Sequence, residues 1–157
     1  MAATHHATAA RMTPEEVAAS QRERLLRAMA SAAAEKGYRA TTVGDVVGIA
    51  RVSRKTFYEH FDGLEACFLE AYEACLQQLR AALAQALDPE LEPVEQGRRL
   101  IESYLGLLAA EPELAKTYLV ESWSAGPRTS AQRRETLHEI AGPVSYTHLT
   151  LPTNREV

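Results

Sequence analysis

Hydrogen-bond donors and cations are concentrated in one short segment of this sequence, between Ser53 and Phe61. The segment also holds two phenylalanines four residues apart. Its cations, hydroxyls and histidine are Arg54, Lys55, Thr56, Tyr58 and His60. Such side chains bind phosphate oxygens and base edges, so nucleic-acid binding is the chemistry that this segment suits best. A solvated cationic helix face is the alternative for a charged segment of this kind.

The residues before this segment predict the elements that position it. Thr42 and Asp45 have the spacing of a reciprocal capping box, and four apolar residues then recur on one helical face: Val43, Val46, Val47 and Ala50. Ser53 is a favourable N-cap for a second helix, which buries Phe57 and Phe61. Two short helices joined at Arg51-Val52 predict a helix-turn-helix, a motif whose second helix enters the major groove of DNA.

The sequence from about Gln21 to Tyr72 resembles the DNA-binding domain of TetR/AcrR-type transcriptional regulators. The residues that carry the resemblance are Gly37-Tyr38, Thr41-Thr42, Glu65 and the run Val52-Ser53-x-x-Thr56-Phe57-Tyr58-x-His60-Phe61. The resemblance implies that five side chains contact the phosphate backbone, namely Thr42, Ser53, Thr56, Tyr58 and His60. It also implies that Arg54 and Lys55 read base edges.

Three residues depart from the family pattern. Arg51 stands where a turn glycine is common, so a positive φ there would cost on the order of 1 kcal/mol. Gly48 lies inside the first helix, which costs about 1 kcal/mol relative to alanine. Leu64 replaces a lysine that usually lies beside a phosphate, so one cationic contact is expected to be absent.

Longer helices are predicted on both sides of the helix-turn-helix. An amphipathic helix from Pro14 to Lys36, ended by Gly37, is expected to pack across it. Asp62 and Glu65 have capping-box spacing and predict a long connecting helix to Leu87, stopped by Asp88-Pro89.

The second half of the chain predicts further helices at 94–110 and 113–123, and another beginning near Thr129. The resemblance implies an effector-binding domain here, with Tyr104, Tyr118 and Trp123 as candidate residues of a small-molecule pocket. Core packing between amphipathic helices is the alternative for these aromatic residues. His138 has no ligand partner at suitable spacing and is expected on the surface.

Charge is divided unevenly along the chain. The formal net charge is -4, but residues 1–62 carry nine Lys and Arg against seven Asp and Glu, leaving the remainder strongly acidic. DNA affinity should therefore depend on a local basic patch and fall steeply with salt. No run approaches about 18 apolar residues, so no membrane span is expected, and we expect a cytoplasmic protein.

No constellation of residues predicts an enzyme, a cofactor or a metal site. The chain lacks a glycine-rich phosphate loop and Cys/His metal spacing. Cys67 and Cys75 are eight residues apart on one predicted helix, too far for an unstrained disulfide, and are expected to be buried thiols.

The sequence changes character at Gly142-Pro143. The segment 143–157 shows no helical or strand period, and back-translation of Pro143 to Thr153 in one reading frame resembles the mosaic-end adapter of tagmentation libraries. We therefore expect 143–157 to be a non-native tail, and the natural protein to continue beyond Gly142.

These observations predict an all-α protein with four parts. They are a disordered arm (1–13), a three-helix helix-turn-helix domain (14–62), a connecting helix with an incomplete effector-binding and dimerisation domain (63–142), and the tail. The expected function is that of a transcriptional regulator, a repressor released from a palindromic double-stranded DNA operator by a small-molecule effector. The full-length parent is expected to be a homodimer with an interface incomplete in these 157 residues. The alternative is a helical ligand-binding or interaction module without operator binding.

Overall fold

The computed structural model describes the backbone of residues 12–148 and the side chains of residues 12–138. Most of the predicted N-terminal arm lies outside this range. Helix α1 spans Pro14–Lys36, as predicted. Thr13 and Glu16 form a reciprocal capping box at its start, and Gly37, with φ 86°, ends it. Only glycine adopts such a conformation without strain, which explains why the helix stops there.

The helix-turn-helix consists of α2 (Val43–Ala50) and α3 (Arg54–His60), joined to α1 by the short 3-10 helix η1 (Tyr38–Ala40). Both predicted caps are present. Thr42 and Asp45 bond reciprocally at the start of α2, and the Thr56 amide donates to Ser53 Oγ at 3.0 Å at the start of α3. Local sequence therefore determines where both helices begin.

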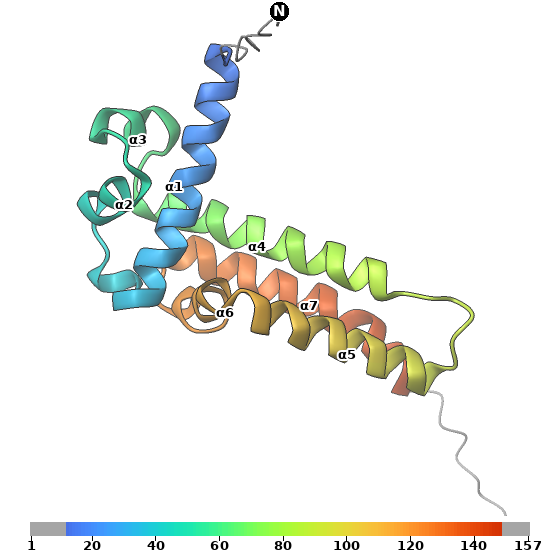
Figure 1. The fold of residues 1–157 in the computed structure, drawn as a ribbon. Helices are drawn as coiled ribbons and strands as arrows, with labels where there is room; N and C mark the ends of the chain where they lie inside the picture. The colour runs from blue at the N-terminus through green and yellow to red at the C-terminus, as the bar shows by residue number, and fades with distance from the viewer. Residues whose placement is uncertain (1–11, 149–157) are drawn as a thin grey trace, which may run out of the picture.

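Five further helical segments follow the helix-turn-helix in the described part of the chain. They are α4 (Leu64–Ala86), α5 (Pro93–Ala110), α6 (Pro112–Leu119), the 3-10 helix η2 (Glu121–Trp123) and α7 (Pro127–His148). In Figure 1, α4, α5 and α7 run together away from α1, with α2 and α3 on the other side of α1. The prediction of an all-α chain is confirmed for residues 12–148.

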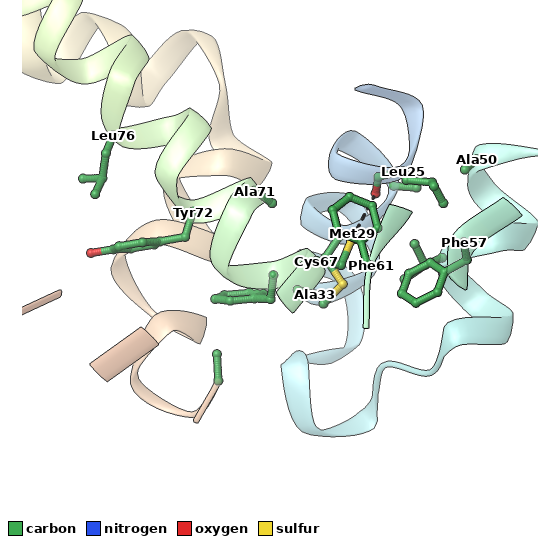
Figure 2. Packing of buried hydrophobic residues seen from close by; sticks show 14 residues of the cluster. Leu25, Met29, Ala33, Ala50, Phe57, Phe61, Cys67, Ala71, Tyr72 and Leu76 are labelled. Atoms are coloured by element: carbon green, nitrogen blue, oxygen red, sulfur yellow. Dashed lines mark hydrogen bonds between the residues drawn. The ribbon is translucent and has the colours of Figure 1, made fainter. Parts of the chain in front are cut away.

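One hydrophobic core joins α1, the helix-turn-helix and the first half of α4 (Figure 2). Its largest fully buried side chains include Leu25 and Met29 from α1, Phe57 from α3, and Phe68 and Tyr72 from α4. Burial of each large side chain stabilises the fold by roughly 1.5–3 kcal/mol. The core thus fixes α2 and α3 relative to α1 and α4.

The structure corrects two predictions about the helix ends. Asp62 and Glu65 do not form a capping box, because Gly63 is the N-cap of α4 and makes no side-chain cap bond. Glu65 instead accepts a hydrogen bond from the Arg128 amide at 3.2 Å, in the first turn of α7, where free amides attract a carboxylate.

The second correction concerns the end of the last helix, whereas the non-native origin of 143–157 stays a prediction. Helix α7 continues through Gly142 and Pro143 to His148, although the sequence there lacks a helical period. A proline inside a helix removes one backbone hydrogen bond, and its ring crowds the carbonyl four residues earlier, so the helix continues past Pro143 at a local cost of about 3 kcal/mol. The rest of the predicted tail, 149–157, lies outside the described residues.

Candidate nucleic-acid interface

The outward face of α3 presents a cation and a phenol that are accessible to a ligand. Lys55 is exposed, and its Nζ lies 3.7 Å from Glu59 Oε1 in a loose surface pair. The Tyr58 side chain is 59% exposed, and its ring lies edge-on against the buried Phe57. Because Phe57 and Phe61 anchor the opposite face, α3 cannot rotate to hide these groups.

Arg54 is exposed but lies closer to α2 than Lys55 does. A Cβ placed on Gly44 would lie 3.2 Å from Arg54 Nη2 and 3.4 Å from Thr42 Oγ1. The guanidinium therefore lies over the first turn of α2, beside Thr42. The guanidinium is therefore placed to donate to a phosphate group at the start of α2.

The two hydroxyls at the start of α3 are joined to one another. Ser53 Oγ and Thr56 Oγ1 are 2.9 Å apart, and Ser53 also accepts from the Thr56 amide. His60 is half-buried at the other end of α3, with its ring beside that of Phe61. These three residues border the exposed face that carries Lys55 and Tyr58.

Asp45 holds the Thr42 hydroxyl. Thr42 Oγ1 donates to Asp45 Oδ2 at 2.6 Å, and Lys36 Nζ lies 2.5 Å from the same oxygen. The Lys36 contact, followed by the Thr42 bonds, lowers the pKa of the Asp45 carboxyl to about 2. Lys36 is therefore a further cation at the edge of this surface, although the periodicity of α1 marks it only as a helix end.

The turn between the two helices has the conformation for which a glycine would be favourable. Arg51 has φ 54° and ψ 48°, in the left-handed region, where a side chain costs on the order of 1–2 kcal/mol. Its amide still donates to the Val47 carbonyl and closes α2. Half-buried Val52 packs against the core, which holds the turn in place.

The arrangement matches a major-groove reader. A short helix anchored by two phenylalanines projects Lys55 and Tyr58, while hydroxyls stand at the starts of α2 and α3. Residues 25–71 match the family described as bacterial regulatory proteins, tetR family. The chain carries a tetR-family DNA-binding domain.

Solved structures show that the tetR-like arrangement extends beyond this domain. The fatty acid degradation regulator FadR of Bacillus halodurans superposes with a TM-score of 0.69 at 16% identity, covering 87% of this chain and 69% of FadR. A TetR-like transcriptional regulator of Rhodococcus sp. RHA1 gives 0.65 at 21% identity, covering 79% and 67% of the two chains. A proposed fatty acid metabolism regulator of Clostridium perfringens gives 0.67 at 20% identity, covering 85% and 74%. No curated protein matches this sequence.

The start of α4 in this tetR-family domain carries no cation. Leu64, which stands where the family commonly has a lysine, is half-buried and packs against the core. The amides of the first turn of α4 have no side-chain cap, and free amides at a helix start attract anions. Any phosphate contact at this point would therefore involve the backbone.

A small cavity lies between α4, α5 and α6, outside the tetR-family domain. Tyr104 and Tyr118, both predicted pocket residues, line it together with apolar side chains that include Leu79, Leu107, Leu108 and Leu114. Trp123, the third predicted pocket residue, does not line it. The indole is 66% exposed, donates to the Leu119 carbonyl at 3.1 Å, and lies under the Arg133 guanidinium.

The cavity encloses only about 20 Å³, but it adjoins a much larger opening. A cleft of about 750 Å³ lies between α1, α4 and the start of α6, and four residues line both spaces: Cys75, Gln78, Glu111 and Leu114. Glu23 and Arg27 of α1 form part of the outer rim. The cleft and the inner cavity are therefore neighbours that share one wall.

Other site types find little support in the described part of the chain. No cluster of three or more potential metal ligands occurs among residues 12–138, and no helix there is long and apolar enough to cross a membrane. Both cysteines are free thiols; Cys67 is buried, as predicted, whereas Cys75 is only half-buried. Burial raises the pKa of Cys67 to about 12 and that of Cys75 to about 11, so both thiols are protonated near neutral pH.

Proposed function

We propose that this chain is a ligand-responsive transcriptional repressor that binds a palindromic operator. The observation that carries the proposal is the exposed face of α3, held rigidly by buried Phe57 and Phe61 within a tetR-family domain. Lys55 and Arg54 are the proposed base readers. Phosphate contacts are assigned to Thr42, Ser53, Thr56, Tyr58 and His60.

Lys55 is the more accessible of the two base readers. Its side chain is 87% exposed, whereas the Arg54 guanidinium lies over Gly44. We therefore expect Lys55 to contact base edges from the observed position, and Arg54 to do so only after it moves off α2. In the observed position, Arg54 is placed to bind a phosphate, and Thr42 can join it only if its hydroxyl turns away from Asp45.

The effector is proposed to bind in the cavity between α4, α5 and α6, entering through the cleft beside α1. The lining is mainly leucine and tyrosine, which favours a ligand with a large apolar part. Two of the structural neighbours are described as regulators of fatty acid degradation or metabolism. An acyl chain is therefore the effector class that we propose to test first.

A mobility-shift experiment with DNA from upstream of the protein's own gene tests the proposal. Wild-type protein should shift this DNA in preference to unrelated DNA of equal length. Lys55→Ala and Tyr58→Phe should weaken the shift by roughly tenfold each, because each loses a direct DNA contact. Arg134→Ala is the charge-matched control, since Arg134 is exposed on α7, away from the proposed contacts.

The same experiment tests effector release. A saturated fatty acid of about twelve or more carbons should dissociate the protein from DNA, whereas butyrate should not. The reason is that each buried CH₂ contributes about 0.8 kcal/mol to binding of the acid. Equal effects of both acids would reject the acyl proposal. Shifts unaffected by both Lys55→Ala and Tyr58→Phe would instead reject α3 as the DNA-binding element and support the alternative of an interaction module.

A further inference from the structure

The end of α1 lacks one hydrogen bond that a continuing helix would make. In such a helix the Tyr38 amide would donate to the Ala34 carbonyl, four residues earlier. Here α1 ends at Lys36, Gly37 turns the chain with φ 86°, and both groups bind side chains from the second half of the molecule. The end of α1 is therefore completed by residues more than 80 positions away in the sequence.

Helix α6 and η2 supply both of the missing partners. The Tyr38 amide donates to Glu121 Oε2 at 2.8 Å, and Lys116 Nζ donates to the Ala34 carbonyl. Thr117 Oγ1 adds a buried bond to the Ala30 carbonyl at 3.0 Å. A cation at the carboxyl end of a helix is also favourable electrostatically. We call Lys116, Thr117 and Glu121 the inter-domain cap.

The segment held by this cap leads directly into the DNA-binding surface. The Thr41 amide donates to the Tyr38 carbonyl at 3.0 Å, and Thr41 Oγ1 donates to the Gly37 carbonyl at 2.9 Å. The next residue is Thr42, which caps α2. The Tyr38 ring packs edge-on against Phe68 of α4. The position of Tyr38 therefore affects where α2 begins.

One turn of α6 carries two residues of the inter-domain cap on one side and lines the effector cavity on the other. Leu114, Ala115 and Tyr118 line the cavity, while Lys116 and Thr117 bind α1. The cavity volume of about 20 Å³ is close to that of a single water molecule. A larger effector fits only if the helices that line the cavity move apart. A displacement of α6 away from α4 and α5 would also strain the bonds from Lys116 and Thr117 to α1.

We propose that Lys116 and Glu121 are positioning residues through which α6 holds the DNA reader in place. Effector binding displaces α6, breaks the bonds to Ala34 and Tyr38, and frees α2 and α3 to leave the geometry that fits DNA. This inference rests on the proposed function. It adds a direct connection from α6 to α1, separate from any movement of α4.

Amide hydrogen exchange tests the cap independently of DNA. In Glu121→Ala the Tyr38 amide should exchange about tenfold faster than in the wild type, since it loses a charged acceptor. The amides of Val46 and Val47 in α2 should also exchange faster than in the wild type. Glu121→Gln keeps a carbonyl acceptor and should restore most of the protection. Glu135→Ala, at an exposed position on α7, is the charge-matched control and should change neither site.

DNA affinity is then measured on the same variants, with the probe from upstream of the gene. Glu121→Ala should bind about fivefold more weakly, and Glu121→Gln close to wild type. Unchanged Tyr38 exchange in Glu121→Ala would overturn the cap itself. Faster exchange confined to Tyr38, or unchanged DNA affinity, would overturn its positioning role. If the wild type binds no DNA specifically, the proposed function fails, and exchange at Tyr38 and α2 still decides the inference.

Discussion

The half of this molecule that is proposed to read DNA (the reader) and the half that is proposed to bind an effector (the ligand-binding half) differ in how completely they bury apolar side chains. In the reader, Leu25, Met29 and Phe57 are fully buried in one core. In the other half, α5 has no buried residue, and Val94 and Ile101 are 88% and 60% exposed. Low burial permits local motion at little cost. The reader therefore holds a fixed geometry, whereas the ligand-binding half can deform around a ligand or add a partner.

The starts of the helices show the same contrast. Thr13, Thr42 and Ser53 accept hydrogen bonds at the starts of α1, α2 and α3. Helices α4, α5 and α6 have no side-chain cap bond. A side-chain cap contributes about 1 kcal/mol, so local sequence stabilises the reader more strongly than the ligand-binding half. Four predictions test this contrast.

The largest expected difference is between two truncations of buried and exposed side chains. Phe57→Ala should lower the free energy of unfolding by about 3–5 kcal/mol, because it opens a cavity in the core. Ile101→Ala, at an exposed site on α5, should change it by less than about 0.5 kcal/mol. Urea denaturation followed by circular dichroism measures both. If Phe57→Ala does not fold, Phe57→Leu should still cost about 1 kcal/mol. Equal costs in the two halves would contradict the contrast.

A smaller effect is expected at the strained turn. Arg51→Gly should raise the free energy of unfolding by about 1 kcal/mol, since glycine adopts φ 54° without a steric cost. The comparison is Arg39→Gly in η1. Arg39 has no positive φ, so glycine there should lower the free energy of unfolding. Thermal melting of both variants gives the sign. If Arg51→Gly also melts earlier, Arg51 is not a source of strain.

Two helical glycines then test whether the halves unfold together. A Cβ would meet no atom within 4 Å at Gly48 in α2 or at Gly106 in α5. Alanine should therefore stabilise each helix by about 0.5–1 kcal/mol. Trp123, the single tryptophan, reports on the ligand-binding half by fluorescence. We expect Gly106→Ala to raise the melting midpoint of the Trp123 fluorescence and Gly48→Ala to leave that midpoint unchanged. Equal shifts would show that the two halves unfold as one cooperative unit.

The smallest effect concerns acid. The pKa of Asp45 is lowered to about 2 in the folded protein, whereas an aspartate in the unfolded chain has a pKa of about 4. The bonds of Asp45 to Lys36 and Thr42 therefore stabilise the folded state to their full extent when the pH is above about 4. That contribution should be lost as the pH falls toward about 2. Melting of wild type and Asp45→Asn at several pH values measures it. The gap between the two proteins should narrow below about pH 4, and a constant gap would contradict the assignment.

Short-range signals in the sequence predicted the reader well. Thr42 with Asp45 and Ser53 with Thr56 lie three residues apart, so the caps and starts of α2 and α3 follow from local hydrogen-bond chemistry. The family match confirms the helix-turn-helix. Which of its side chains touch DNA stays a prediction from the resemblance, supported by the exposure of Lys55 and Tyr58.

Long-range contacts account for what the sequence did not reveal. Glu65 binds the start of α7, and Glu121 binds Tyr38, across 63 and 83 positions. No periodic pattern marks such pairs, because each depends on how distant helices pack. Trp123 looked like a pocket residue by its type, yet the break between α6 and η2 leaves it on the surface. The ligand-binding half was therefore predicted in outline and not in detail.

The central claim is that α3 reads DNA through Arg54 and Lys55. Its most direct test is the ratio of affinities for upstream and unrelated DNA, measured by fluorescence anisotropy over a salt series. The wild type should prefer upstream DNA by at least about a thousandfold, and the Arg54→Ala/Lys55→Ala variant should lose at least about tenfold of that preference. Arg134→Ala should keep it. Full retention of the preference by the double variant would contradict the account.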